Sequence, residues 1–494
     1  MEFQSTREET SSHYSAARVI KQGLAEDGGL FVPESIPALS YAEIEELRHL
    51  DYPTRAAKIL GKYLTDYTEE ELLADCRAAY AETSFRGGAA PLVALSDTLF
   101  SLELWHGPTA AFKDMALQIM PRLLSRALGK TGEARTALIL VATSGDTGKA
   151  ALEGYKDIDQ IKIAVFYPEN GVSRVQKLQM QTQEGKNVYV AAIKGNFDDA
   201  QTGVKKIFSL PLAAETLNEK GYFLSSANSI NWGRLAPQIV YYVSAYCDLL
   251  NAGKLNLGDK MNVTVPTGNF GNIFAAYLAR EMGLPIGKLV CASNENNILT
   301  DFLRTGIYDR NRAFHLTMSP SMDILISSNL ERLLFFAAGA ARTREYMRAL
   351  SKDGKYTVAP DVKAKIDEVF CGYFADEKVT AATIHDTMRD YGYLADTHTA
   401  VGISAAKQYM TETGDKTPMV VASTASPFKF AADVYASLYG ERPGDPLAAL
   451  SMLSEKTGAE IPYPLCGIDR RTVRFSDVIA PENMLDTVLA FADK

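Results

Sequence analysis

The segment HGPTAAFKDMALQ, from His106 to Gln118, places Lys113 between a Gly-Pro turn and the start of an amphipathic helical pattern. Most lysines are solvated charges on the protein surface. A lysine at a corner between a strand and a helix, flanked by Phe112 and Met115, can instead point into a pocket. There its amine can form a Schiff base with a carbonyl compound. Lys113 is therefore a candidate nucleophile, and a solvated surface lysine is the alternative.

Two glycine-rich corners could hold anions. The segment PTGNFGN, Pro266 to Asn272, follows the apolar run MNVTV and precedes a helical pattern. Its glycines allow a tight turn that presents several N–H groups, and a helix N-terminus attracts phosphate. It matches neither GxxxxGK[ST] nor GxGxxG. The segment SGDTGKAA, Ser144 to Ala151, is a similar corner that suits a second anion, for example a carboxylate. Each corner alone could also be a turn without a ligand.

Two further polar segments follow apolar runs. SSANSINWGR, residues 225–234, offers amides, hydroxyls and the guanidinium of Arg234, which suit a phosphate but also fit ordinary loop and capping roles. VASTASPFKF places Ser423 and Thr424 where a hydroxyl can bond to a heterocyclic nitrogen or cap the next helix. Asp146 is expected to cap its helix or orient a donor, because a carboxylate repels a bound anion.

These corners together match the needs of one cofactor, pyridoxal phosphate. Its aldehyde takes a lysine as a Schiff base, its phosphate suits a glycine-rich helix start, and its ring is an electron sink. The sequence therefore predicts a pyridoxal-phosphate enzyme that uses Lys113, a phosphate cradle in the corner 266–272 and a second anion site in the corner 144–151.

The elements that position these corners alternate in type. Near-continuous apolar runs are each followed by a polar or glycine-rich corner and a helical pattern, as in TALILVATSGDTGKAALEGY, MNVTVPTGNFGNIFAAYLAR and PMVVASTASPFKFAADVY. Such runs are typical of strands buried on both faces, and the alternation predicts an α/β fold with mostly parallel sheets. Ligands bind beyond the carboxyl ends of such strands, where these corners lie.

The pattern also divides the chain. We predict an N-terminal module at 1–90 and a catalytic region at 91–450, followed by a C-terminal extension at 451–494. Within the catalytic region we expect a small subdomain at about 136–240. The stretch at about 328–395, which includes VKAKIDEVFCGYF, is predicted to be a largely helical insertion.

Composition limits the function classes. The 494 residues include 51 Lys and Arg and 60 Asp and Glu, which gives a net charge of −9. This mild negative charge gives no support to a nucleic-acid or anionic-membrane partner. No apolar run is long enough to span a bilayer, and the N-terminal residues lack the apolar region of a secretory signal. Five scattered cysteines favour a reducing, cytoplasmic compartment. The histidines form no metal-ligand motif, so no metal is expected, and His398 is interpreted as a packed or capping residue.

Six motifs in order, GLAEDGGLFVP, HGPTAAFKDMALQ, TSGDTGKAA, NSINWGR, PTGNFGN and SPSMDI, resemble the threonine synthase family, in the longer form found in many bacteria and fungi. The resemblance runs from about residue 5 to about residue 435. It implies the tryptophan-synthase-β-like fold, fold type II of pyridoxal-phosphate enzymes. It also implies conversion of O-phospho-L-homoserine and water to L-threonine and phosphate, through γ-elimination and β-hydration on a cofactor aldimine.

The resemblance also implies roles for individual residues. Lys113 would form the aldimine, and Thr424 would bond to the pyridine nitrogen. The cofactor phosphate would be held by Gly268, Asn269, Phe270, Gly271 and Asn272. The substrate carboxylate would bind at Ser144, Gly145, Asp146 and Thr147. The substrate phosphate would bind at Asn228, Asn231 and Arg234, with Ser173 and Lys177 as further candidates.

The sequence departs from the family at three positions. Ser426 stands where the family usually has histidine, Asn297 where aspartate is frequent, and Thr397 where proline is frequent. These changes do not affect Lys113 or the phosphate cradle. A related phospho-lyase, a serine/threonine dehydratase and a non-catalytic paralogue that binds the cofactor remain alternatives. A monomer or a homodimer is expected.

Overall fold

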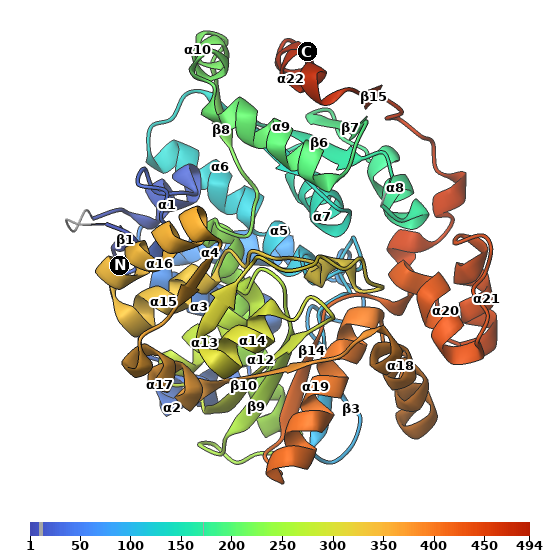
Figure 1. The fold of residues 1–494 in the computed structure, drawn as a ribbon. Coiled ribbons are helices and arrows are strands. Elements are labelled where there is room, and N and C mark those ends of the chain that lie inside the picture. The colour runs from blue at the N-terminus through green and yellow to red at the C-terminus, as the bar shows by residue number, and fades with distance from the viewer. Residues whose placement is uncertain (9–12, 171) are drawn as a thin grey trace.

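The computed structural model describes residues 1–8, 13–170 and 172–494, and its main strands form two sheets (Figure 1). The larger sheet has the order β13-β10-β9-β14-β4-β3, in which only the β3–β4 pair is antiparallel. Its strands are β3 (Leu92–Ala94), β4 (Leu99–Glu103), β9 (Met261–Pro266), β10 (Ile286–Ser293), β13 (Phe370–Phe374) and β14 (Met419–Ser423).

The smaller sheet has the order β15-β7-β6-β5-β8 and is parallel throughout. Its strands are β5 (Thr136–Ala142), β6 (Ile161–Pro168), β7 (Val188–Ile193), β8 (Tyr222–Ser225) and β15 (Val478–Ile479). The prediction of mostly parallel sheets in two subdomains is confirmed.

The central strands are buried on both faces, as their apolar runs predict. Every residue of β4, β9 and β14 is buried. Helix α19 packs on β9, β10 and β14, and α12 packs on α13. The helices of this region include α5 (Asp114–Leu117), α6 (Met120–Lys130), α7 (Asp146–Tyr155), α8 (Arg174–Gln181), α11 (Trp232–Leu235), α12 (Pro237–Asn251), α13 (Gly271–Glu281), α14 (Ile298–Thr305) and α19 (Thr397–Thr413).

The N-terminal module packs against the segment that carries Arg234. It comprises the antiparallel pair β1 (Phe3–Ser5) and β2 (Phe31–Pro33), with the helices α1 (Ala16–Gln22), α2 (Tyr41–Leu47), α3 (Tyr52–Tyr63) and α4 (Glu69–Ala79). The rings of Phe3 and Tyr63 lie 5.3 and 5.5 Å from the ring of Trp232. The module therefore shares its core with the catalytic region.

The stretch 328–395 is largely helical but also contributes two strands. It contains α15 (Leu330–Ala338), α16 (Ala340–Asp353), α17 (Pro360–Val369) and α18 (Glu377–Tyr391), but also β13 and β12 (Lys355–Thr357), which pairs with β11 (Ile307–Asp309). Helix α17 ends at Val369, inside the segment VKAKIDEVFCGYF. The residues after it extend the larger sheet, and a Cβ at Gly372 would lie only 2.9 Å from the Cα of Thr300. The close approach of α14 to this strand was not apparent from local pattern.

The C-terminal segment connects the two subdomains (Figure 1). Helix α21 (Ala448–Thr457) packs on α20 (Ala431–Tyr439), and the chain then runs to the smaller sheet, where β15 pairs with β7. There α22 (Met484–Ala492) contacts α9 (Phe197–Ser209) and α10 (Pro211–Glu219). In the described part of the chain, no helix has the length and apolar character needed to cross a membrane.

Candidate active site

Lys113 lies between the end of β4 and the start of α5 and is 9% exposed. Its Nζ lies 3.3 Å from Oγ of Ser321 and 3.6 Å from Oδ2 of Asp146. Burial lowers the pKa of Lys113; Asp146 opposes this effect, and the charges of Lys429 and Arg234 add to it. A lysine in this setting is not a solvated surface charge, and its amine is more readily available as a nucleophile or base.

Asp146 joins two buried lysines. Its Oδ1 lies 2.6 Å from Nζ of Lys429 and accepts a hydrogen bond from Nε2 of Gln176 at 2.7 Å. Burial raises the pKa of Asp146, but Lys429 and Lys113 outweigh it and hold that pKa well below the usual range. The N-cap of α7 is Gly145, so the alternative in which Asp146 caps the helix is wrong. Its carboxylate instead balances the charge of the site.

Lys429 was not singled out by the sequence. Its side chain has no exposed surface, and its Nζ also donates to the carbonyl oxygen of Thr109 at 3.0 Å. It lies in the 3-10 helix η2 (Pro427–Phe430), inside the apolar segment PFKFAA. A charged residue at the centre of such a segment was the available signal, because buried lysines are rare without a partner.

The corner 268–272 has the geometry of a phosphate cradle. Phe270 adopts the left-handed conformation, with φ of 62°, just before α13 begins. None of the N–H groups from Gly268 to Asn272 donates to another group within the described residues. A Cβ at Gly268 would lie 2.9 Å from the carbonyl oxygen of Ser321, so only glycine leaves this space open. Free donors at a helix N-terminus fit the phosphate of the predicted cofactor.

The side chains of this corner support its backbone. Asn272 donates to the carbonyl oxygen of Pro266 at 3.0 Å and accepts from the hydroxyl of Thr267 at 2.5 Å. The carbonyl oxygen of Asn269 accepts a hydrogen bond from Nδ2 of Asn329 at 2.9 Å. The main-chain N–H groups therefore remain available as donors for a phosphate.

Thr424 has a hydroxyl for which the described residues provide no hydrogen-bond partner, while its carbonyl oxygen accepts from the N–H of Phe112 at 2.8 Å. The neighbouring hydroxyl of Ser423 accepts from Nε1 of Trp105 at 3.0 Å. The 3-10 helix that follows is capped by Ser426, not by either of these residues. Because its hydroxyl is free within the described part of the chain, Thr424 suits a hydrogen bond with the ring nitrogen of the predicted cofactor better than Ser423 does.

The corner 144–147 forms a second set of free donors. Oγ1 of Thr143 accepts the N–H groups of Gly145 and Gly148, at 3.0 and 2.9 Å. Within the described residues the N–H groups of Ser144, Asp146 and Thr147 have no acceptor. Gly145 has a φ of 141° and a Cβ there would strike Gln176 at 2.6 Å. This helix N-terminus can accept a carboxylate.

Arg234 is a buried cation without an acidic partner among the described residues. It is 4% exposed, its Nη1 donates to the carbonyl oxygen of Ala227 at 2.5 Å, and its Nε has no partner. Burial lowers its pKa to about 10. A buried guanidinium is normally paired, so an anionic ligand is the expected complement.

The other candidates for the substrate phosphate differ from Arg234. Asn231 caps α11 by accepting the N–H of Gly233 at 2.9 Å and donates to the carbonyl oxygen of Ile20 at 2.9 Å. Asn228 is exposed, and Ser173 caps α8. Lys177 is half-buried. Their binding roles stay predictions, and Asn231 in addition ties the N-terminal module to the site.

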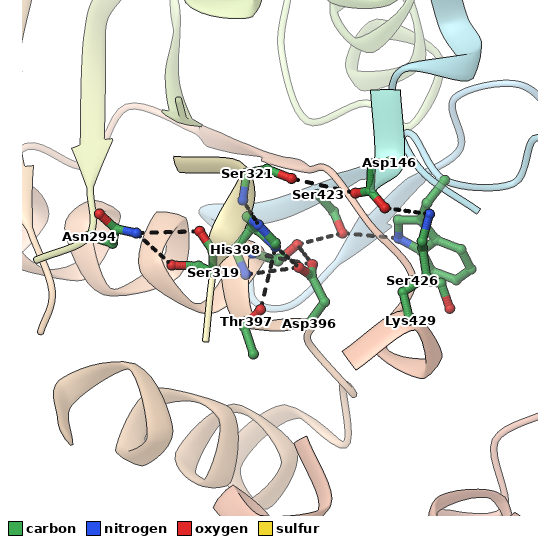
Figure 2. A network of polar contacts seen from close by, with 12 residues as sticks. Asp146, Asn294, Ser319, Ser321, Asp396, Thr397, His398, Ser423, Ser426 and Lys429 are labelled. Carbon is green, nitrogen blue, oxygen red and sulfur yellow. Dashed lines mark hydrogen bonds and ion pairs between the residues drawn. The ribbon is translucent and has the colours of Figure 1, made fainter. Parts of the chain in front are cut away.

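A network of polar contacts runs through the site (Figure 2). It links Asp146 to Ser321, Ser321 to His398, and His398 to Asp396. The ring of His398 is buried and packs against Phe430 with centroids 4.9 Å apart, which agrees with its interpretation as a packed residue. Its contact with Ser321 was not predicted, because the two residues lie far apart in sequence.

The three departures from the family pattern also have defined places. Ser426 accepts the N–H of Phe428 at 3.3 Å. Oδ1 of Asn297 accepts from Arg312 at 3.3 Å, and Thr397 is buried in the first turn of α19. Only Ser426 is adjacent to the segment that carries Thr424.

The fold and the site together define a pyridoxal-phosphate enzyme of fold type II. The family model described as pyridoxal-phosphate dependent enzyme matches residues 83–425. Two further models, threonine synthase N terminus and threonine synthase, C-terminal, match residues 2–80 and 399–479. The chain belongs to the threonine synthase family, and its cofactor is pyridoxal phosphate, as the motifs predicted.

Individual relatives agree with this assignment. The chain is 40% identical over 444 residues to threonine synthase from Pseudomonas aeruginosa, covering 89% of this chain and 90% of that protein. It is 41% identical over 445 residues to human threonine synthase-like 1, covering 87% of this chain but only 59% of the human protein.

Solved structures are similar over the full length. The pyridoxal-phosphate-bound threonine synthase from Brucella melitensis gives a TM-score of 0.89 at 37% identity and covers 100% of both chains. Threonine synthase from yeast gives 0.89 at 32% identity and 99% of both chains.

Proposed function

We propose that this protein is a threonine synthase that converts O-phospho-L-homoserine and water to L-threonine and phosphate. The observation that carries the proposal is the presence of two anion sites besides the cofactor cradle. One is the set of free N–H groups at the start of α7, and the other is Arg234, whose charge acts on Lys113. A substrate with both a carboxylate and a phosphate needs both.

Pyridoxal phosphate, when bound, supplies an electron sink for negative charge on the substrate carbons. The N–H groups of 268–272 would hold its phosphate and Thr424 its ring nitrogen. Since a hydroxyl, unlike a carboxylate, does not favour protonation of that nitrogen, Thr424 would leave it largely neutral. This part of the proposal rests on the free donors and the free hydroxyl described above.

Lys113 moves the protons. Its amine takes the proton from Cα of the substrate and returns one to Cα at the end. In between, a proton leaves Cβ, the Cγ–O bond breaks with departure of phosphate, and Cγ gains a proton. The hydroxyl of water then joins Cβ, and the other proton of the water ends on the released phosphate. Burial lowers the pKa of Lys113, so its amine is more readily available as a base. Arg234 would stabilise the phosphate as it leaves.

A pyridoxal-phosphate-dependent phospho-lyase is the second candidate, because relatives named threonine synthase-like 1 match this chain as well as named threonine synthases do. It would release phosphate, ammonia and a keto acid. A paralogue without turnover is disfavoured by the intact Lys113 and cradle. We further propose a cytoplasmic location, which the unpaired cysteines support, and a monomer or homodimer.

One experiment separates these functions. The purified protein is mixed with pyridoxal phosphate and O-phospho-L-homoserine, and threonine, 2-oxobutanoate and phosphate are assayed together. Equal amounts of threonine and phosphate support the synthase, whereas phosphate with 2-oxobutanoate supports the phospho-lyase. Lys113→Ala is the control: it should stay folded and lose both the lysine–cofactor absorbance and turnover. Retained turnover in this variant would refute the role of Lys113.

A further inference from the structure

Ser321 lies between Lys113 and the phosphate cradle. Its Oγ lies 3.3 Å from Nζ of Lys113 and 3.5 Å from Oδ2 of Asp146. Its carbonyl oxygen would lie 2.9 Å from a Cβ at Gly268. Ser321 is in the 3-10 helix η1 (Pro320–Met322), within the motif SPSMDI, to which none of the roles above has been assigned.

The backbone of Ser321 is held by a buried histidine (Figure 2). Nε2 of His398 lies 3.2 Å from the N–H of Ser321, and Nδ1 of His398 lies 3.0 Å from Oδ1 of Asp396. A backbone N–H can only donate, so Nε2 must carry the lone pair and Nδ1 the proton, which it donates to Asp396. The geometry therefore fixes one tautomer of His398.

Asp396 is itself held firmly. It is the N-cap of α19 and has no exposed side-chain surface. Its carboxylate accepts the N–H of His398 at 2.8 Å, the N–H of Thr399 at 3.2 Å and the hydroxyl of Thr399. With these donors and Nδ1 of His398, the carboxylate makes four contacts, which keep the histidine ring in one orientation.

The loop that carries Ser321 has independent anchors. Nδ2 of Asn294 donates to Oδ1 of Asp323 at 2.7 Å and to Oγ of Ser319 at 3.0 Å. The hydroxyl of Thr317 donates to the same Oδ1 at 2.7 Å. The contacts made by the hydroxyl of Ser321 are those with Lys113 and Asp146. This hydroxyl therefore serves the lysine and is not required to hold the loop.

We propose that Ser321 is a further residue of the catalytic site, whose hydroxyl accepts a hydrogen bond from Nζ of Lys113, and that His398 and Asp396 are positioning residues that fix it there. The inference rests on the assignment of Lys113 in the proposed function. When Lys113 is not joined to the cofactor, Ser321 holds its nitrogen beside Asp146. The amine then moves protons from one fixed place.

Three charged groups around Lys113 affect its pKa and must be considered in a test of Ser321. Asp146 faces it from α7, Lys429 from η2 and Arg234 from α11. Ser321 adds a neutral acceptor to this set. An acceptor stabilises the ammonium form more than the neutral amine, so its removal should lower the pH at which Lys113 loses its proton.

The measurement is the rate at which the apoenzyme captures pyridoxal phosphate, followed by absorbance in a stopped-flow instrument from pH 6 to pH 10. Ser321→Ala should lower the midpoint of this profile by about one pH unit, about a tenfold loss of proton affinity. His398→Phe, which keeps a ring beside Phe430, should shift it in the same direction. Ser319→Ala on the same loop and His385→Phe on the surface are matched controls and should keep the wild-type midpoint.

A second measurement concerns His398 directly. Nitrogen NMR of the histidine-labelled apoenzyme, assigned by comparison with His398→Phe, should show the Nδ1–H tautomer. A wild-type midpoint in Ser321→Ala, an equal shift in Ser319→Ala, or the Nε2–H tautomer would each overturn the proposal. If the midpoint shifts as expected but the wild-type enzyme makes no threonine, the role of Ser321 stands and the proposed reaction fails.

Discussion

Asp146→Asn would test the charge balance behind Lys113. The substitution keeps the shape of the side chain but removes the carboxylate that lies 2.6 Å from Nζ of Lys429. Lys429 has no exposed side-chain surface, and its other acceptor is the neutral carbonyl oxygen of Thr109. Leaving one charge of a buried pair uncompensated costs about 3–5 kcal/mol. We expect the variant to lose about that much stability at pH 7.

The assay is thermal unfolding of the apoenzyme, followed by circular dichroism. An unfolding entropy of about 2 cal/mol/K per residue amounts to about 1 kcal/mol/K for a chain of this length, so the midpoint should fall by about 3–5 °C. The low pKa of Asp146 adds a pH signature. Its contribution is present above about pH 4, the unfolded value, and is lost as the pH falls through the folded value. The difference between wild type and variant should therefore narrow in acid.

Asp114→Asn is the matched control. Asp114 is also buried, but it accepts from the N–H and the hydroxyl of Thr109, at 2.8 and 2.7 Å, and pairs with neither lysine. Burial raises the pKa of Asp114 to about 6, so an amide replaces a carboxylate whose charge is already costly. This variant should lose less stability. An unchanged unfolding midpoint in Asp146→Asn, or an equal loss in Asp114→Asn, would refute the reasoning.

Arg234→Gln should raise KM for the phosphorylated substrate by about tenfold or more in steady-state kinetics while cofactor binding stays unchanged, because it removes one charged donor; an unchanged KM would contradict the assignment. Gly268→Ala should weaken cofactor binding by about tenfold in an absorbance titration, because its Cβ meets a carbonyl oxygen 2.9 Å away. Arg332→Lys loses the forked donors that hold the carbonyl oxygens of Phe31 and Ile230, and should cost about 2–3 kcal/mol in urea unfolding.

Local sequence pattern was sufficient to predict the sheets and the corners at the carboxyl ends of their strands. The apolar runs TALILV and MNVTV form β5 and β9, as predicted. A strand that is buried on both faces is recognised by a continuous apolar run. Glycines marked the two helix starts, since a tight turn and close approach to a ligand require them. Lys113 was singled out by its position between a Gly-Pro turn and a helical pattern, although the groups that surround its amine come from distant segments.

The residues that sequence reasoning missed depend on contacts between distant segments. Ser321 lies 208 positions from Lys113, and Lys429 lies 320 positions from Thr109, whose carbonyl oxygen it contacts. A serine in a loop carries no local signature of this role, and the signal of Lys429, a charge inside the apolar segment PFKFAA, does not identify its partners. The strand β13 was missed for the same reason: its burial comes from β10 and α14, which local pattern cannot place beside it.

The charges at the site bear on which substrate it suits. Lys113, Lys429 and Arg234 are three buried cations, and Asp146 is the carboxylate that faces the two lysines. Leaving a cation uncompensated in a buried site is costly, so the remaining charge favours ligands that bring anions of their own. A hydroxy amino acid, as in a dehydratase, brings one carboxylate and leaves Arg234 unpaired. A phosphorylated amino acid complements both Arg234 and the start of α7, so the charge balance favours a phosphorylated substrate over serine or threonine.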